Sequence, residues 1–275
     1  AARRLPFLAF GFPLLCLALL TVAIAFPVAV GRHLQSLYFT WSPYHYAAQG
    51  YGIAVMYAMR SGCRLDASEK RALHILALAP FAYAFVTSAG AGLDWLLPAS
   101  WMSSAPLQAL LSVARPALIA LGLGGPLLLW IGLARRGKTL PLTSGLAVLM
   151  NGIWWYFLPA MEAFIWATFF HAAQYLAIVL VFHVREQGDL GAGGRARSAL
   201  GFYGLCLGLG YALFNCLPQA YAWAGFTTTE SLLLVIAAVN LHHFIVDGFI
   251  WKLGRQDPNR AVVDAPNGAP LPSRA

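Results

Sequence analysis

Apolar residues occupy nearly the whole chain in stretches of about 20, separated by short polar segments. A helix needs about 20 such residues to cross a hydrocarbon core of about 30 Å. Backbone polar groups are satisfied in lipid only in helices or closed barrels, and these stretches are too long and too continuously apolar for barrel strands. The pattern therefore predicts an all-α, polytopic membrane helix bundle with about eight transmembrane helices, at residues 5–31, 36–59, 72–97, 106–134, 140–158, 161–184, 198–221 and 228–250.

Polar residues just before three of these stretches agree with the boundaries. Asp66 and Glu69 form a capping-box pattern before the third span, in which each side chain binds the other's backbone N–H. Ser104 precedes the fourth span, and Thr227 with Glu230 precedes the eighth. These signals predict where three helices begin.

No second domain is visible in the sequence. We expect one transmembrane domain over residues 1–254, a flexible linker at 188–197 and a disordered cytoplasmic tail at 255–275, which is rich in Pro, Asn and Asp. The apolar stretch at 5–31 is longer than that of a signal peptide, so it is expected to stay as a membrane anchor.

Composition agrees with the membrane assignment. The 275 residues are 60% hydrophobic and 10% charged, whereas a soluble domain carries about 25% charged residues. If the N-terminus is cytoplasmic, the positive-inside rule is obeyed by every Lys and Arg except Arg32 and Arg115. Both termini are then cytoplasmic, in an inner membrane of bacterial type. The net charge of +8 is explained by Lys and Arg in cytoplasmic segments and by attraction to anionic lipid. No nucleic-acid partner is expected.

One stretch matches a nucleotide-binding motif by its letters alone. GLARRGKT, residues 132–139, has the glycine and Lys-Thr spacing of a phosphate loop. A true phosphate loop follows a buried strand and opens a helix, so that its N–H groups surround the phosphates. Here a membrane helix precedes the motif and Pro141 follows it. We therefore expect no bound nucleotide.

Four of the seven histidines, His45, His171, His242 and His243, lie deep inside predicted spans, where ionisable residues are rare and indicate function. His74 and His183 lie at the cytoplasmic ends of spans and His33 lies at the outer surface. The spans that carry the four deep histidines, the second, sixth and eighth, all run from the outer to the inner face. His45 and His171 come about ten residues from the outer ends, hence about 15 Å deep at 1.5 Å per residue, and His242 and His243 lie about one turn deeper. Three helices are thus predicted to offer imidazoles in one layer.

Three of these histidines have polar neighbours on their own helical face, three or four residues away. They are Gln49 for His45, Gln174 and Tyr175 for His171, and Asp247 for His243. Such neighbours orient metal-binding imidazoles, and imidazoles without thiolates suit iron, zinc or copper. We predict a metal site formed by His45, His171 and either His242 or His243. Two alternatives stay open: haem held between two histidines, and histidines that only join helices.

Two further polar residues are candidates for the same layer. Arg115 lies about nine residues into the fourth span, where it would bind a carboxylate or polarise oxygen; if that span starts later, it lies in the interface instead. Asn151 is in the middle of the fifth span, either as a packing residue or as a donor to a metal ligand.

Three segments resemble a known family. WSPYHYAAQGYG around His45, FFHAAQYLAIV around His171 and NLHHFIVDGFIW around His242 are similar to the histidine motifs of the Brp/Blh-type membrane β-carotene oxygenases. Members of that family are multi-helix bacterial proteins that cleave carotene to retinal with non-haem iron. A Pro-His-Gly-Ala-Leu-Asp motif of the family has no counterpart here, and Tyr175 stands where the family has a further histidine. The resemblance selects His242 as ligand, whereas helical spacing pairs Asp247 with His243.

The resemblance implies a non-haem iron oxygenase that acts on a lipophilic substrate, such as a carotenoid or another isoprenoid, entering from the bilayer. In that reaction Gln49 and Asp247 orient ligands, and Tyr175 or Arg115 polarises an intermediate. Two other functions stay open: a haem-binding electron carrier, and a non-enzymatic membrane carrier or assembly subunit.

Overall fold

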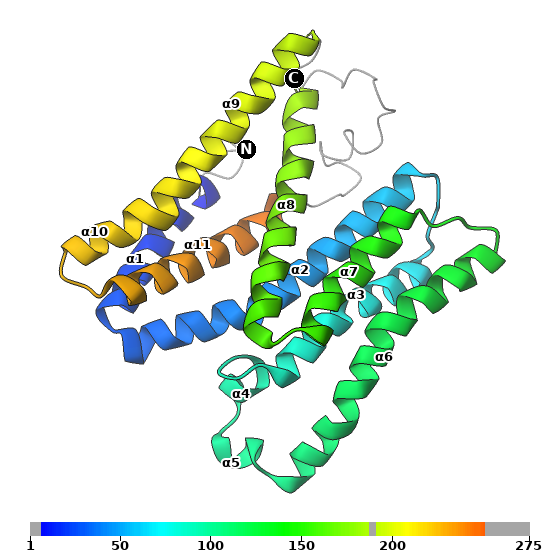
Figure 1. Cartoon of the computed structure of the whole chain (residues 1–275), viewed down its shortest axis with the longest axis horizontal. Helices are drawn as coiled ribbons and strands as arrows, with labels where there is room; N and C mark the ends of the chain where they lie inside the picture. The colour runs from blue at the N-terminus through cyan, green and yellow to red at the C-terminus, as the bar shows by residue number, and fades with distance from the viewer. Residues whose placement is uncertain (1–6, 187–190, 251–275) are drawn as a thin grey trace. The chain divides into compact units, whose positions relative to one another are not determined.

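A computed structural model describes residues 7–186 and 191–250. Every regular element in these residues is a helix and none is a strand, which confirms the all-helical class (Figure 1). The predicted tail at 255–275 lies outside the described residues. The helices are α1 Phe12–Ala25, α2 Arg32–Arg60, α3 Ala67–Thr87, α4 Gly92–Leu96, α5 Ala99–Met102, α6 Ala105–Arg135, α7 Leu142–Phe157, α8 Ala160–Glu186, α9 Ala192–Tyr211, α10 Leu217–Trp223 and α11 Thr228–Ile250, with short π-helical segments η1 Phe7–Gly11, η2 Pro27–Gly31 and η3 Ala212–Cys216.

Four helical segments of the described chain are long and apolar enough to cross a membrane, by length and composition. They are Ala105–Arg135, Ala160–Val184, Gly193–Trp223 and Thr228–Gly248. These segments coincide with the fourth, sixth, seventh and eighth predicted spans, and they indicate a membrane protein. Helix α1 is also apolar but has only 14 residues.

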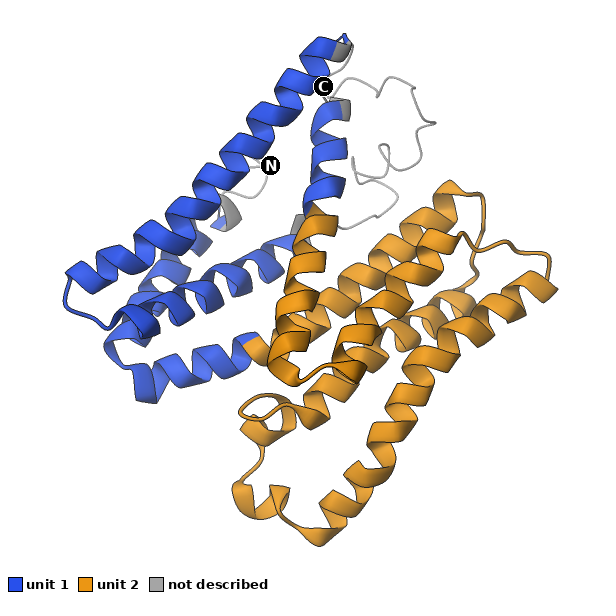
Figure 2. Cartoon of the chain, in the orientation of Figure 1, with its two compact units in different colours: residues 1–38, 176–275 blue, residues 39–175 orange. Residues whose placement is uncertain are grey.

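The chain divides into two compact units (Figure 2). One unit combines residues 1–38 and 176–275, and the other comprises residues 39–175. In the first, α11 packs against α1 and α10; in the second, α3 packs against α6 and α7, and α6 packs against α7. Because the unit boundaries fall inside α2 and α8, these two helices contribute to both units.

The predicted capping box is present at the start of α3. A carboxylate oxygen of Asp66 accepts a hydrogen bond from the Glu69 backbone N–H at 2.9 Å, and Glu69 Oε2 accepts one from the Asp66 N–H at 2.8 Å. These bonds satisfy two of the N–H groups that a helix start leaves without partners. At the start of α11, the Thr227 hydroxyl donates to Glu230 at 2.5 Å. Ser104 is the residue before α6.

The first predicted span was wrong in its boundary. Instead of a continuous stretch over 5–31, the chain leaves the helical conformation at Phe26 (φ −126°, ψ 66°). The cause is Pro27, since proline disfavours a helical residue before it. Helix α2 then begins at Arg32 rather than at residue 36.

Two other boundaries also differ from the prediction. The span predicted over 72–97 ends with α3 at Thr87, because Gly90 (φ 68°) and Gly92 (φ 55°) turn the backbone into the left-handed region. The Asp94 carboxylate, on α4, closes this turn by accepting from the Gly90 N–H at 2.7 Å. Residues 192–197, predicted as part of a linker, are helical from Ala192 onward.

Lys138 and Arg136, within the phosphate-loop-like stretch, are engaged in an ion-pair cluster. Lys138 Nζ lies 2.5 Å from Glu69 Oε2, and Arg136 lies 3.5 Å from Glu69 Oε1. The Glu69 side chain is only 3% exposed, and its pKa is lowered chiefly by the hydrogen bond from Lys138. The same bond raises the pKa of Lys138. These contacts attach the turn between α6 and α7 to the start of α3.

Candidate metal centre

His45 on α2 and His171 on α8 lie side by side. Their ring centroids are 4.9 Å apart, with the ring planes at 72°. Each residue is 9% exposed, and a ligating nitrogen of one lies within 4.8 Å of a ligating nitrogen of the other. Both belong to the unit of residues 39–175. Two histidines 126 residues apart in sequence therefore form a buried pair.

Two side chains next to this pair join α2 to α8. The Tyr46 hydroxyl is hydrogen-bonded to Thr168 Oγ1 at 2.8 Å, and its ring packs on the ring of His171, with centroids 4.6 Å apart. One turn further along α2, Gln49 Nε2 donates to the backbone carbonyl of His171 at 3.5 Å. Gln49, predicted as a neighbour of His45, thus bridges to the helix that carries the other histidine.

Helix α2 also contacts α7. Gly50 permits this approach, because a Cβ there would lie 3.1 Å from the backbone oxygen of Ala147. The fully buried Ser144 donates to the carbonyl oxygen of Ala54 at 2.7 Å. Such hydrogen bonds between helices stabilise membrane proteins by about 0.6 kcal/mol on average. Together these contacts place α2, α7 and α8 around one space.

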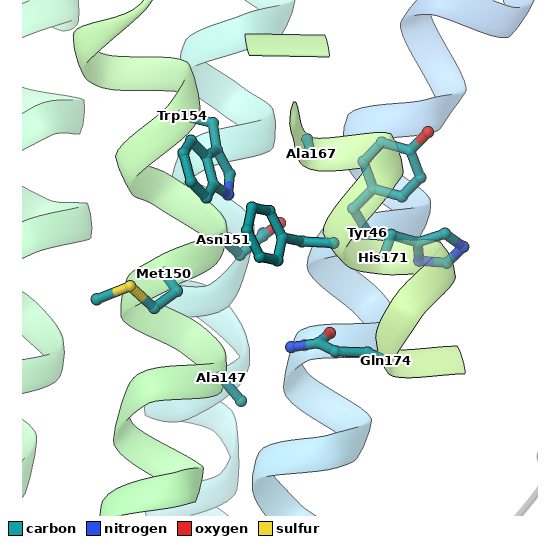
Figure 3. A pocket seen from close by; sticks show the side chains of 10 residues that line it. Tyr46, Ala147, Met150, Asn151, Trp154, Ala167, His171 and Gln174 are labelled. Atoms are coloured by element: carbon teal, nitrogen blue, oxygen red, sulfur yellow. The ribbon is translucent and has the colours of Figure 1, made fainter. Parts of the chain in front are cut away.

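That space is a cavity of about 300 Å³ (Figure 3). Its lining residues are Tyr46 and Gly50 from α2, Ala147, Met150, Asn151 and Trp154 from α7, and Ala167, Phe170, His171 and Gln174 from α8. Figure 3 shows Gln174 reaching toward α7, while the ring of His171 turns toward Tyr46. His171 thus lines the cavity, and its ring packs against the ring of His45.

Three aromatic rings of α7 and α8 stack on one another, and two of them, Trp154 and Phe170, line the cavity. Trp154 stacks on Phe170, with centroids 4.9 Å apart and planes at 9°, and on Trp166 at 5.9 Å and 19°. Trp166 and Phe170 are nearly parallel to each other as well, at 28°. The three rings thus form a stack that joins α7 to α8.

The predicted pair on α11 lies in the other unit, the one that combines residues 1–38 and 176–275. His243 Nε2 is 3.5 Å from a carboxylate oxygen of Asp247, one turn along the helix. His242 instead stacks on Phe12 of α1, with centroids 5.1 Å apart. Asp247 therefore orients His243 and not His242, as the helical spacing implies.

The remaining predicted site residues differ in their positions. Tyr175 stacks near His171 at 6.4 Å and 27°, and Asn151 and Gln174 line the cavity. Arg115 does not line it. On α6, Nε of Arg115 is buried and has no hydrogen-bond partner among the residues that the structure describes.

Sequence reasoning missed Tyr46 and Thr168 as partners. Each lies next to or near a predicted ligand, but they are 122 residues apart. A single sequence contains no signal for such a contact, because it depends on how each helix is rotated about its axis.

The donor set suits a transition metal. Neutral imidazoles bind iron, zinc and copper. The two here are buried, and one of them, His171, lines a cavity whose other side chains are aromatic, aliphatic and amide groups. Two ligands leave coordination positions for further donors and for a substrate.

Comparison with protein-family models, with curated proteins and with solved structures finds no match to this chain. The resemblance to the carotene oxygenases therefore stays a prediction.

Proposed function

We propose that this chain is an integral membrane oxygenase that binds a non-haem metal, iron, through His45, His171 and His243 and acts on a lipophilic substrate. The supporting observation is the close, buried approach of His45 and His171, whose ring centroids lie 4.9 Å apart. When bound, the metal would supply activation of dioxygen. The protein would supply the ligands, the dry surroundings and the cavity next to them.

The geometry of the pair supports a metal held by both rings. Nitrogens bound to one ion at about 2.1 Å lie about 3 to 4 Å apart, so the present separation, within 4.8 Å, requires only a small turn of the rings. Imidazoles on opposite sides of a haem iron have centroids about 6 Å apart, from iron–nitrogen bonds of about 2 Å. The pair is closer than this, which favours a non-haem metal over haem.

The third ligand is proposed from the sequence together with the local contacts of α11. His243 falls in the same predicted layer as His45 and His171, and the carboxylate of Asp247 is 3.5 Å from its Nε2. A carboxylate in this position fixes the orientation of a ligating imidazole and raises its basicity. His242, which stacks on Phe12, has a packing role in this proposal.

The membrane arrangement is part of the proposal. Eight spans with both termini cytoplasmic would put nearly all Lys and Arg side chains on the inner face of a bacterial-type membrane. A carotenoid or another isoprenoid would then enter the site from the bilayer, and Tyr175, which stacks near His171, would polarise an intermediate.

The test is oxygen consumption and absorption spectroscopy on detergent-purified, iron-loaded protein with a polyene substrate. We expect substrate-dependent oxygen uptake and no Soret band, with uptake lost in His45→Ala and His171→Ala and kept in His183→Ala. His183 is a matched control because it lies on the same helix as His171 but binds Ser198 and stacks on Phe202. A strong Soret band would identify a haem carrier, and absence of both iron and uptake would indicate histidines that only join helices.

A further inference from the structure

The cavity beside His171 is lined by the amide group of Asn151. Nδ2 of Asn151 is buried and has no hydrogen-bond partner within the part of the chain that the structure describes. It lies on α7, at the lining of the cavity, and Figure 3 shows Asn151 and Trp154 on the side that faces Gln174. A buried N–H donor without an acceptor is unfavourable, and a ligand that brings an acceptor removes this penalty.

The aromatic stack lies beside this donor. Trp154 and Phe170 both line the cavity and stack on each other, with planes within 9°. Aromatic rings prefer offset stacking with other flat π-systems. Trp154 is one turn after Asn151 on the same helix, so that the stack and the donor are next to each other.

The remaining lining residues restrict the ligand further. Among the described residues that line the cavity there is no Asp, Glu, Lys or Arg, so a neutral ligand is favoured over an ion. A volume of about 300 Å³ is at the lower end of the range for ligand pockets. It is large enough for one ring system, and a longer hydrocarbon tail would lie outside it.

We propose that this cavity binds a planar, conjugated ring that carries a carbonyl group. The ring packs against the Trp154–Phe170 stack as a further layer, and the carbonyl oxygen accepts a hydrogen bond from Nδ2 of Asn151. Gln174 borders the ligand from α8. Quinone head groups and ring ketones of polyenes share this chemistry. As a statement about substrate the proposal rests on the proposed function, but the binding itself requires no metal.

The experiment measures binding by equilibrium dialysis against the full chain in detergent, both metal-loaded and treated with chelator. Two matched pairs of probes differ in the carbonyl alone or nearly so: 2-methyl-1,4-naphthoquinone against 2-methylnaphthalene, and canthaxanthin against β-carotene. We expect the carbonyl member of at least one pair to bind at least tenfold more tightly than its hydrocarbon. The pair that shows this preference identifies a quinone or a ring-ketone polyene as the natural class.

Variants test whether the Asn151 donor causes the preference for the carbonyl probe and whether the Trp154 ring contributes to binding. Asn151→Leu should abolish the tenfold preference, and Asn151→Ala, which removes the donor without adding volume, should do the same. Trp154→Ala should weaken the binding of both probes of a pair. Asn240→Leu is the matched control, because Asn240 is also an asparagine within a predicted span but donates to the Ile236 carbonyl at 2.8 Å; it should keep the preference.

The proposal is overturned if neither carbonyl probe binds more tightly than its hydrocarbon, or if both Asn151 variants keep the preference. Its failure is distinguishable from failure of the proposed function, because chelator-treated protein reports ligand binding without metal. Carbonyl preference without any metal binding would support the cavity proposal and contradict the oxygenase.

Discussion

The hydroxyl of Tyr46 lies 2.8 Å from that of Thr168, and this contact joins the two helices that carry His45 and His171. Each partner is adjacent to or one turn from a proposed ligand, so the hydrogen bond, with that of Gln49 to the His171 carbonyl, holds together the helix segments that carry the two imidazoles. Positioning residues of this kind affect a metal site through geometry and not through direct ligation.

Removing either hydroxyl should loosen the pair. Tyr46→Phe and Thr168→Val should each lower the free energy of unfolding in micelles by about 0.5 to 1.5 kcal/mol, and the double variant should cost less than the sum. A double-mutant cycle measures this coupling. Because the two hydroxyls position the proposed ligands, both variants should also change metal affinity. Tyr221→Phe, which removes a similar 2.8 Å contact with Thr21 at an exposed position, should leave metal affinity unchanged. Strictly additive losses for Tyr46 and Thr168 would contradict the contact.

The two neighbouring histidines of α11 should behave differently. His243→Ala and Asp247→Asn should weaken metal binding, the latter by about 10- to 100-fold, because Asp247 orients His243. His242→Ala should leave metal affinity nearly unchanged, since His242 stacks on Phe12. Competition titrations with a coloured chelator measure these affinities. Loss of metal in His242→Ala alone would reverse the assignment.

Gly122 provides a test of the helix packing behind the site. A Cβ at Gly122 would overlap the phenol ring of Tyr156, with Cζ only 2.7 Å away, so Gly122→Ala should destabilise the protein by about 1 to 3 kcal/mol. Gly124→Ala, on the same helix with no atom within 4 Å of the added Cβ, should have little effect. Thermal unfolding of the two variants gives the comparison, and equal melting temperatures would show that α6 and α7 do not approach as described.

The capping box at α3 predicts a dependence of stability on pH. The pKa of Asp66 is lowered to about 2, first by the hydrogen bond from the Glu69 backbone N–H and next by the Ser68 hydroxyl. Its ordinary value is 3.8. A carboxyl with a lower pKa in the folded state stabilises that state above its ordinary pKa, and this stabilisation is lost as pH falls toward 2.

Melting temperatures measured from pH 5 to pH 2.5 should therefore fall less steeply for Asp66→Asn than for the natural chain. Ser68→Ala, which removes only the second hydrogen bond, should give an intermediate slope. If the natural chain and Asp66→Asn lose stability in parallel, Asp66 does not contribute through its charge.

The sequence predicts the helical class and most helix positions, because a run of 20 apolar residues has few other stable structures. It misplaces boundaries where a single residue decides, as at Pro27, before which the first helix ends, and at Gly90, where the backbone turns left-handed. Hydropathy averages over many residues and does not detect such local effects.

The candidate site, like the fold, is predicted from the sequence only in part. Depth counting along helices of equal direction predicts that His45 and His171 lie at one level, and in the structure their ring centroids are 4.9 Å apart. The contacts of Tyr46 with Thr168 and of Gln49 with the His171 carbonyl depend on helix rotation, which hydropathy leaves undetermined. The same holds for the Trp154 and Phe170 stack.

X-ray absorption spectroscopy of iron- or zinc-loaded protein tests the central claim, that His45 and His171 share one metal ion. We expect one bound ion per chain, with imidazole nitrogens at about 2.0 to 2.2 Å, and loss of that signal in His45→Ala and in His171→Ala. A bound ion that shows no imidazole scattering would contradict the claim. So would a spectrum that stays the same in His45→Ala and His171→Ala as in the unsubstituted protein.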